Sequence, residues 1–286
     1  MTAGLNASLL LLLMNVPGAH PEPAGGASHL TPRSTIRDLL NHPAFAGFGR
    51  LTLPWDDRAY DEGLPMARIA TLLPYHSHVD PETVTNALNR MIDDASSGKT
   101  VFYSFYTEAQ ARQEPARRQT GLFFFRGEPG APFAIICPGG GFSYAGSVHE
   151  GFPYAEAVSR KGYNAFVLKY RVGHGGTPAT ADLAAAVSYV FQNAAALGVS
   201  TRGYSLWGSS AGARMAAAIG SHGAARYGGA RIPKPSAIVM AYTAHSDYSA
   251  HEPPTFAIVG DQDRIVPAAS MEIRVEALRK SGAIVE

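Results

Sequence analysis

The pattern of apolar and polar positions changes at Thr100. After it, short β-rich runs alternate with longer segments of helical periodicity. Seven runs predict strands, at residues 101–106, 121–125, 133–136, 164–170, 203–207, 237–242 and 255–259. Helices are predicted at 150–161, 181–196, 211–224 and 267–281. Together they predict an α/β fold with a mostly parallel twisted sheet flanked by helices.

Residues 29–99 lack a strong strand pattern and predict a mostly helical extension before the domain at 100–286. The clearest helix begins after Asp80, a favourable N-cap, with Pro81 at the first helical position. Its apolar face carries Val84, Leu88, Met91 and Ile92. We expect this face to pack on the sheet domain.

Residues 1–28 contain an apolar run at 9–14 and then a stretch rich in Pro, Gly and Ala. The run is too short to span a bilayer. A signal peptide would carry positive charge before the run, but the first basic side chain is Arg33. We expect a disordered leader and a cytoplasmic protein, with a signal peptide and export as the alternative.

The composition indicates the class of ligand. With 286 residues, 46% of them hydrophobic, the chain can bury one large core. Lys and Arg number 24 against 23 Asp and Glu, with no long basic run, which argues against a nucleic-acid partner. Cys137 is the single cysteine, so neither an internal disulfide nor a cysteine-rich metal site can form. We expect a small-molecule ligand, and neither a metal nor a membrane partner.

The strongest chemical signal is the G-x-S-x-G sequence at residues 208–212. It follows an apolar run and opens a helix of small residues, as in a nucleophile elbow. Such a turn is sharp, so its flanking residues must be small for the serine to project. Ser210 is therefore the predicted nucleophile, and the Ala211 N–H at the helix start is a predicted oxyanion donor.

A second signal is the run Pro-Gly-Gly-Gly-Phe at residues 138–142, directly after a predicted strand. Glycines allow backbone N–H groups to approach a developing oxyanion without a Cβ in the way. Gly140 and Gly141 are the predicted donors. A phosphate-binding loop is the competing interpretation, but the G-x-x-x-x-G-K-[ST] motif is absent.

These two motifs, in this order, resemble the α/β-hydrolase esterases. More narrowly, residues 137–144, 148–151 and 206–213 are similar to the bacterial acetyl-esterase and feruloyl-esterase-like hydrolases, near the hormone-sensitive-lipase type and more distantly the dienelactone hydrolases. Pro138 departs from the lipase-type motif, which has histidine there. The resemblance covers residues 101 to 286. It implies a serine carboxylic-ester hydrolase for short-acyl or aromatic-acyl esters, carbohydrate-linked esters among them, working through an acyl-enzyme without a cofactor.

The resemblance also implies an acid after the seventh strand. The family places it three residues after a glycine, which here is Gly260, so Asp263 is the predicted acid and Asp261 the runner-up. Asp263 would orient a histidine and stabilise its charged form. The alternative is that Asp263 only caps the helix after Pro267.

In this fold the catalytic histidine follows the acid, yet no histidine follows Asp263. We therefore expect the histidine, with the last strand and helix, to lie beyond Glu286, and the 286-residue chain to be nearly inactive. His245, which follows the sixth strand, is the substitute base to test first. An oligopeptidase-type serine peptidase and a non-catalytic remnant or binding protein are the rival interpretations.

Overall fold

The computed structural model describes residues 28–75 and 78–286. The leader predicted at residues 1–28 lies outside the described residues, except for Ser28. In the described part, no helix is both long enough and apolar enough to cross a membrane.

Seven strands form one mixed sheet in the order β1-β2-β4-β3-β5-β6-β7. Their bounds are Phe102–Tyr103 (β1), Gly121–Phe125 (β2), Pro132–Cys137 (β3), Asn164–Lys169 (β4), Ser200–Ser209 (β5), Ala237–Ala241 (β6) and Thr255–Ile258 (β7). β2 pairs antiparallel with β1 and β4, and the other pairs are parallel. The predicted mostly parallel sheet is confirmed.

Two strands differ from the prediction by more than two residues in length, β1 and β5. β1 has only two residues, because the chain leaves the sheet before Tyr106, whose hydroxyl donates to Asp182 at 2.7 Å. β5 begins at Ser200 rather than at residue 203, beside an irregularity in its register with β3. Gly203 at this irregularity has a φ of 78°, a conformation that glycine adopts without strain.

The helices after the first strand are α3 (Glu108–Gln113), α4 (Phe152–Arg160), α5 (Gly176–Gln192), α6 (Ala194–Leu197), α7 (Ala211–His222) and α8 (Ala268–Lys280). α5 begins at residue 176 rather than 181, because its first turn buries the small side chains of Ala179 and Thr180 and so lacks a stripe of large apolar residues. α3 was not predicted. Its start is fixed by a capping box between Thr107 and Gln110.

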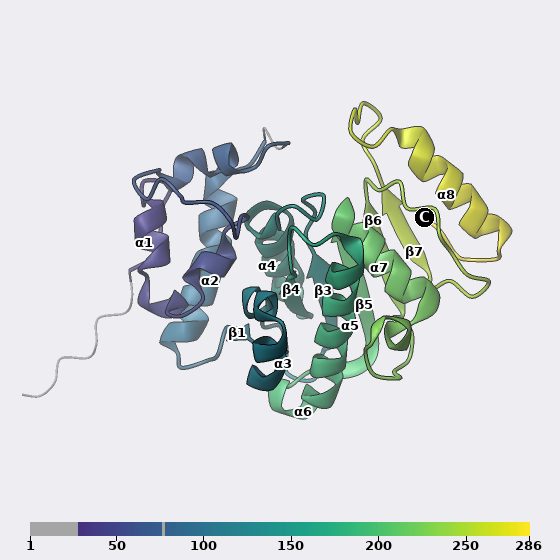
Figure 1. The fold of residues 1–286 in the computed structure, drawn as a ribbon, viewed down its shortest axis with the longest axis horizontal. Helices are drawn as coiled ribbons and strands as arrows, with labels where there is room; N and C mark the ends of the chain where they lie inside the picture. The colour runs from purple at the N-terminus through teal and green to yellow at the C-terminus, as the bar shows by residue number, and fades with distance from the viewer. Residues whose placement is uncertain (1–27, 76–77) are drawn as a thin grey trace, which may run out of the picture.

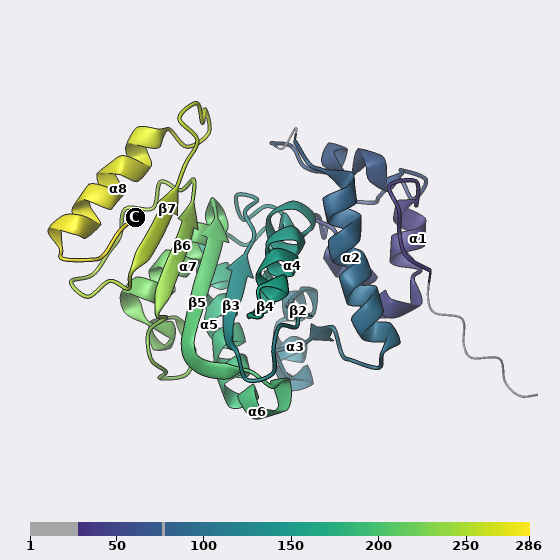
Figure 2. The same cartoon turned by 180° about the vertical axis from the view of Figure 1, so that it is seen from behind.

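The helices form layers on the two faces of the sheet. α3, α5 and α6 lie in front in Figure 1, whereas α2 (Pro81–Ser96) and α4 lie in front in the opposite view of Figure 2. α8 lies beside β7, at the end of the sheet far from α1 (Ile36–Leu40).

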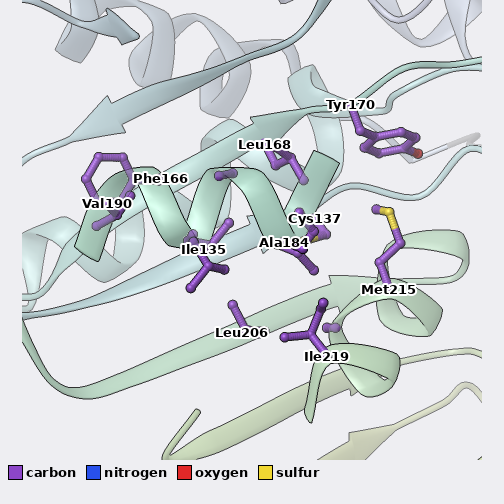
Figure 3. Close-up of a cluster of buried hydrophobic side chains, with 14 of the residues drawn as sticks. Ile135, Cys137, Phe166, Leu168, Tyr170, Ala184, Val190, Leu206, Met215 and Ile219 are labelled. Carbon is purple, nitrogen blue, oxygen red and sulfur yellow. The ribbon is translucent and has the colours of Figure 1, made fainter. Parts of the chain in front are cut away.

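Each face of the sheet has its own apolar core, because successive strand residues point to opposite sides. On β2, Phe124 joins the cluster with α5 and α7, while Phe123 and Phe125 join the cluster with the N-terminal helices and α4. Figure 3 shows the first cluster, where Ile135, Phe166 and Leu206 from three strands meet helix residues. Strands covered on both faces account for the continuous apolar runs in the sequence.

The N-terminal region packs as helices against the second core. Besides α1 and α2 it holds 3₁₀ helices at Pro43–Phe45, Gly49–Thr52 and Met66–Leu72. Asp80 accepts hydrogen bonds from the Glu82 and Thr83 N–H groups, which confirms the predicted N-cap of α2. Lys169 of β4 is fully buried with its Nζ 2.7 Å from Asp56 Oδ1. This ion pair fastens the N-terminal region to the sheet.

Candidate active site

Ser210 lies at a sharp turn between β5 and α7, as the sequence predicted. Its φ of 48° and ψ of −113° are unusual for a residue with a side chain. The Ser210 N–H donates to the Ala241 carbonyl at 2.9 Å, which fixes the turn against β6. Such strain costs about 1–3 kcal/mol and persists only where the surroundings enforce it.

The glycines on either side of Ser210 are required by close backbone contacts. A Cβ on Gly208 would lie 2.3 Å from the Gly212 carbonyl carbon. A Cβ on Gly212 would lie 1.8 Å from the Cys137 carbonyl oxygen. The start of α7 therefore packs directly on the end of β3.

The glycine loop after β3 is held mainly through its carbonyl groups. The Gly139 carbonyl accepts from the Gly146 N–H at 3.0 Å, and the buried Tyr170 hydroxyl lies 3.3 Å from it. The Gly140 carbonyl accepts from the N–H groups of Ser143 and Tyr144 at 2.9 and 3.2 Å.

These contacts decide where the loop's N–H groups point. In a trans peptide the carbonyl and the following N–H point in opposite directions, and the chain has no cis peptide among its described residues. The N–H groups of Gly140 and Gly141 therefore point away from the partners of the carbonyls before them. Within the described residues, neither group donates to a backbone carbonyl.

A cavity of about 600 Å³ brings most of the predicted site residues together. Its lining consists of Tyr75, Gly140, Gly141, Tyr144, His149, Glu150, Tyr154, Ser210, Tyr242, Asp263, Ile265 and Val266. The predicted residues Ser210, Gly140, Gly141 and Asp263 are in this set. Ala211 is not: its side chain is buried at the start of α7. Asp261 is exposed and also outside the set.

Asp263 lies in the loop after β7 and has a local structural partner. Its Oδ1 accepts hydrogen bonds from the N–H groups of Ile265 and Val266, both at 2.8 Å. It does not cap α8, because the residue before that helix is Pro267 and no side chain caps it. Its second carboxylate oxygen accepts no hydrogen bond from the described residues.

Two histidines are candidates for the general base. Among the described histidines, His149 is the one that lines the cavity. His245 is outside the lining set, and burial together with Arg274 and Arg214 lowers its pKa from 6.5 to about 4. His245 is therefore neutral at pH 7.

Sequence reasoning missed Glu150 and Tyr242 as cavity residues. Glu150 is 1% exposed, and its Oε1 accepts from the Tyr242 hydroxyl at 2.9 Å. Tyr242 directly follows β6, and side chains at the carboxyl ends of parallel strands commonly form sites. That rule could have identified Tyr242. The sequence signal for Glu150 was a carboxylate between two large apolar residues, Val148 and Phe152. The structure shows both of them buried.

Tyrosines form much of the cavity wall. Burial raises the pKa of Tyr144, Tyr154 and Tyr242, and the negative charge of Glu150 adds to each shift. These hydroxyls are therefore protonated at neutral pH and offer hydrogen bonds beside apolar rings.

Two further observations concern the thiol near the site and possible metal ligands. Cys137 is fully buried at the end of β3, and burial raises the pKa of its thiol. Over the two described stretches, no cluster of three or more His, Cys, Asp or Glu side chains is placed to hold a metal ion.

The fold is similar to that of solved structures, and part of the sequence matches a family model. Residues 126–232, which include both glycine motifs, match the family model BD-FAE. MGS-M1, an α/β hydrolase enzyme from a Medee basin deep-sea metagenome library, is 28% identical with a TM-score of 0.51, over 58% of this chain and 74% of its own. The chain has the α/β-hydrolase fold.

Two further structures share this hydrolase fold. The acetyl ester-xyloside bifunctional hydrolase from Caldicellulosiruptor lactoaceticus is 23% identical with a TM-score of 0.55, over 65% of this chain and 83% of its own. The esterase Est2 from the Planctomycetes species Thermogutta terrifontis is 20% identical with a TM-score of 0.50, over 58% and 75%. No curated protein sequence matches the chain. These two likenesses, at 23% and 20% identity, concern the fold.

Proposed function

We propose that the protein hydrolyses carboxylic esters through an acyl-enzyme on Ser210. The Ser210 hydroxyl attacks the ester carbonyl, and the N–H groups of Gly140, Gly141 and Ala211 receive the oxyanion. Asp263 orients a histidine that moves the protons. No cofactor takes part in this scheme, because acyl transfer needs only a nucleophile, a base and oxyanion donors.

One observation carries the proposal. Ser210 sits in a strained turn on the cavity that Gly140 and Gly141 also line. The carbonyls before these two glycines are bound on the opposite side, which leaves both N–H groups for a ligand. Backbone donors fixed in this way stabilise an oxyanion with little reorganisation.

The substrate we propose is a small ester with a short or aromatic acyl group, carbohydrate esters being included. The cavity volume of about 600 Å³ is within the usual range for small-molecule sites. Four tyrosines at its wall, Tyr75, Tyr144, Tyr154 and Tyr242, can stack on an aromatic acyl group or a sugar ring. The partner is thus a small molecule, and neither a nucleic acid nor a membrane.

The test compares labelling by a fluorophosphonate probe and hydrolysis of an aryl acetate. Both are measured on the 286-residue chain and on any longer product of the same gene. Ser210→Ala should abolish labelling and lower turnover by about a millionfold in an assembled triad. Ser221→Ala is the matched control, because Ser221 is buried on α7 and its hydroxyl has no hydrogen-bond partner among the described residues. Labelling that persists in Ser210→Ala would reject the nucleophile.

The same assay locates the base. If only a longer product is active, the base lies outside the 286 residues. If the 286-residue chain is equally active, His149→Gln and His245→Gln decide between the histidine that lines the cavity and the one outside it. A chain that binds an ester without cleaving it in either form would support the binding protein instead.

A further inference from the structure

We propose that Glu150 is a positioning residue that holds the oxyanion loop and Tyr242 in place around Ser210. The inference rests on the proposed function, since it assigns a role within the same site. Glu150 lies on the π-helical turn Ser147–Gly151 before α4 and is almost fully buried. It contacts residues after β3 and β6, two strands on either side of the elbow strand β5.

The two carboxylate oxygens of Glu150 accept from different segments. Oε2 accepts from the Gly139 N–H, and Oε1 accepts from the Tyr242 hydroxyl at 2.9 Å. A Cβ built on Gly139 would lie 2.6 Å from Glu150 Oε2 and 3.1 Å from Ser210 Cβ. The carboxylate, the loop and the nucleophile therefore meet around a single point.

The loop needs such an anchor because it consists of three consecutive glycines. Without Cβ atoms, their peptide planes can rotate at little steric cost. Rotation of the Gly139 or Gly140 peptide would turn the Gly140 or Gly141 N–H away from the cavity. Carbonyl partners hold one side of the loop, and Glu150 holds the N–H of Gly139 on the other.

Tyr242 provides the second, independent observation. It is a non-glycine residue with a φ of 38°, directly after β6. Strained backbone of this kind clusters at functional sites and is kept by surrounding contacts. The Tyr242 N–H donates to the Ile258 carbonyl at 2.8 Å and its hydroxyl to Glu150. Glu150 thus also determines where the Tyr242 ring stands in the cavity wall.

Glu150 holds the loop by accepting hydrogen bonds, and this role does not require its negative charge. A negative charge beside an oxyanion would oppose the reaction. A glutamine can keep the arrangement, because its Oε1 can accept from Gly139 and its amide can donate to the Tyr242 oxygen. An alanine leaves the Gly139 N–H and the Tyr242 hydroxyl without this partner.

The experiment compares Glu150→Gln, Glu150→Ala and Tyr242→Phe with the parent, in whichever form of the chain, 286 residues or longer, hydrolyses aryl acetate. Kinetics of aryl acetate hydrolysis and the Kd of phenylboronic acid, which forms a tetrahedral adduct on an active serine, are measured for each. Glu150→Ala should lower kcat about 100-fold with little change in KM, since a 1 Å displacement of reacting groups costs about that much. Its boronate Kd should rise in parallel. Glu150→Gln should stay within about tenfold of the parent. Tyr242→Phe, which keeps Glu150 on Gly139, should lose less kcat than Glu150→Ala.

Amide hydrogen exchange of the peptide covering residues 139–144 tests the anchor without catalysis. Exchange should be faster in Glu150→Ala and unchanged in Glu150→Gln. Equal losses of kcat in the two variants, or unchanged exchange in Glu150→Ala, would overturn the proposal. If the parent shows no Ser210-dependent hydrolysis or boronate adduct, the proposed function fails, and the exchange result alone decides whether Glu150 holds the loop.

Discussion

Gly212→Ala is the most direct test of the elbow. The added methyl group would lie 1.8 Å from the Cys137 carbonyl oxygen and 2.8 Å from the Pro138 carbonyl oxygen. Both neighbours are backbone atoms of β3 and its loop, so neither can turn aside as a flexible side chain would. Since carbon and oxygen approach to about 3.3 Å, the start of α7 and the end of β3 must separate by roughly 1.5 Å.

Two effects of different size follow from this separation. Overpacking of a well-packed core costs about 1–3 kcal/mol, and a clash with fixed backbone belongs at the upper end. That corresponds to a fall in Tm of roughly 6 °C or more for a chain of this length. The same shift moves Ser210 away from Gly140 and Gly141, and even 1 Å of displacement costs about 100-fold in rate.

Thermal and urea denaturation measure the first effect, and aryl acetate hydrolysis the second. Gly146→Ala is the control in the same region, because a Cβ there meets no atom closer than 3.6 Å. It should change stability by less than about 0.5 kcal/mol. If Gly212→Ala melts within about 1 °C of the parent, the close contact between α7 and β3 is wrong, and with it the packing argument for the elbow.

Three further predictions concern charged groups. In a form of the chain that contains the catalytic histidine, Asp263→Asn should lower aryl acetate turnover by about 10⁴-fold, because an amide fixes the wrong histidine tautomer. Asp261→Asn should not, and equal effects of the two substitutions would contradict the choice of acid. Lys169→Met leaves the Asp56 carboxylate, which is 14% exposed, without its partner and should lower the free energy of unfolding by about 3 kcal/mol in urea denaturation, with partial recovery on adding Asp56→Asn. Burial lowers the pKa of His245 from 6.5 to about 4. The unfolded chain therefore binds more protons between these values, and stability falls as the pH is lowered through that window. His245→Gln should flatten this part of the profile, and an unchanged slope would reject the interpretation.

The fold was predictable where local pattern and burial agree. β2 matches its predicted bounds because three consecutive phenylalanines are buried, with both faces of the strand covered. The N-cap of α2 was predictable because Asp80 and Pro81 act on the nearest N–H groups only. The early start of α5 was not, since Ala179 and Thr180 are buried by tertiary packing and not by an apolar stripe in the sequence.

In the candidate site, too, local features were predictable from the sequence and long-range contacts were not. Ser210 and the glycine loop are local backbone features, so the spacing of residues in the sequence predicts them. The contact between Glu150 and Tyr242 joins residues 92 positions apart, and no periodicity in either segment predicts it. The position of Asp263 in the cavity depends on the course of a loop. The sequence identified the residue but did not predict where the loop would place its side chain. Roles in catalysis for these residues stay predictions.

Three strained residues show how the fold supports this site. Phe142, Ser210 and Tyr242 are the described non-glycine residues with positive φ, and each follows the carboxyl end of a parallel strand, β3, β5 or β6. Each costs about 1–3 kcal/mol, which only a rigid surrounding core can sustain. The two apolar clusters provide that core on both faces of the sheet. A change that loosens the core near these strand ends should therefore relax the strained turns, and reduce activity, before the sheet itself unfolds.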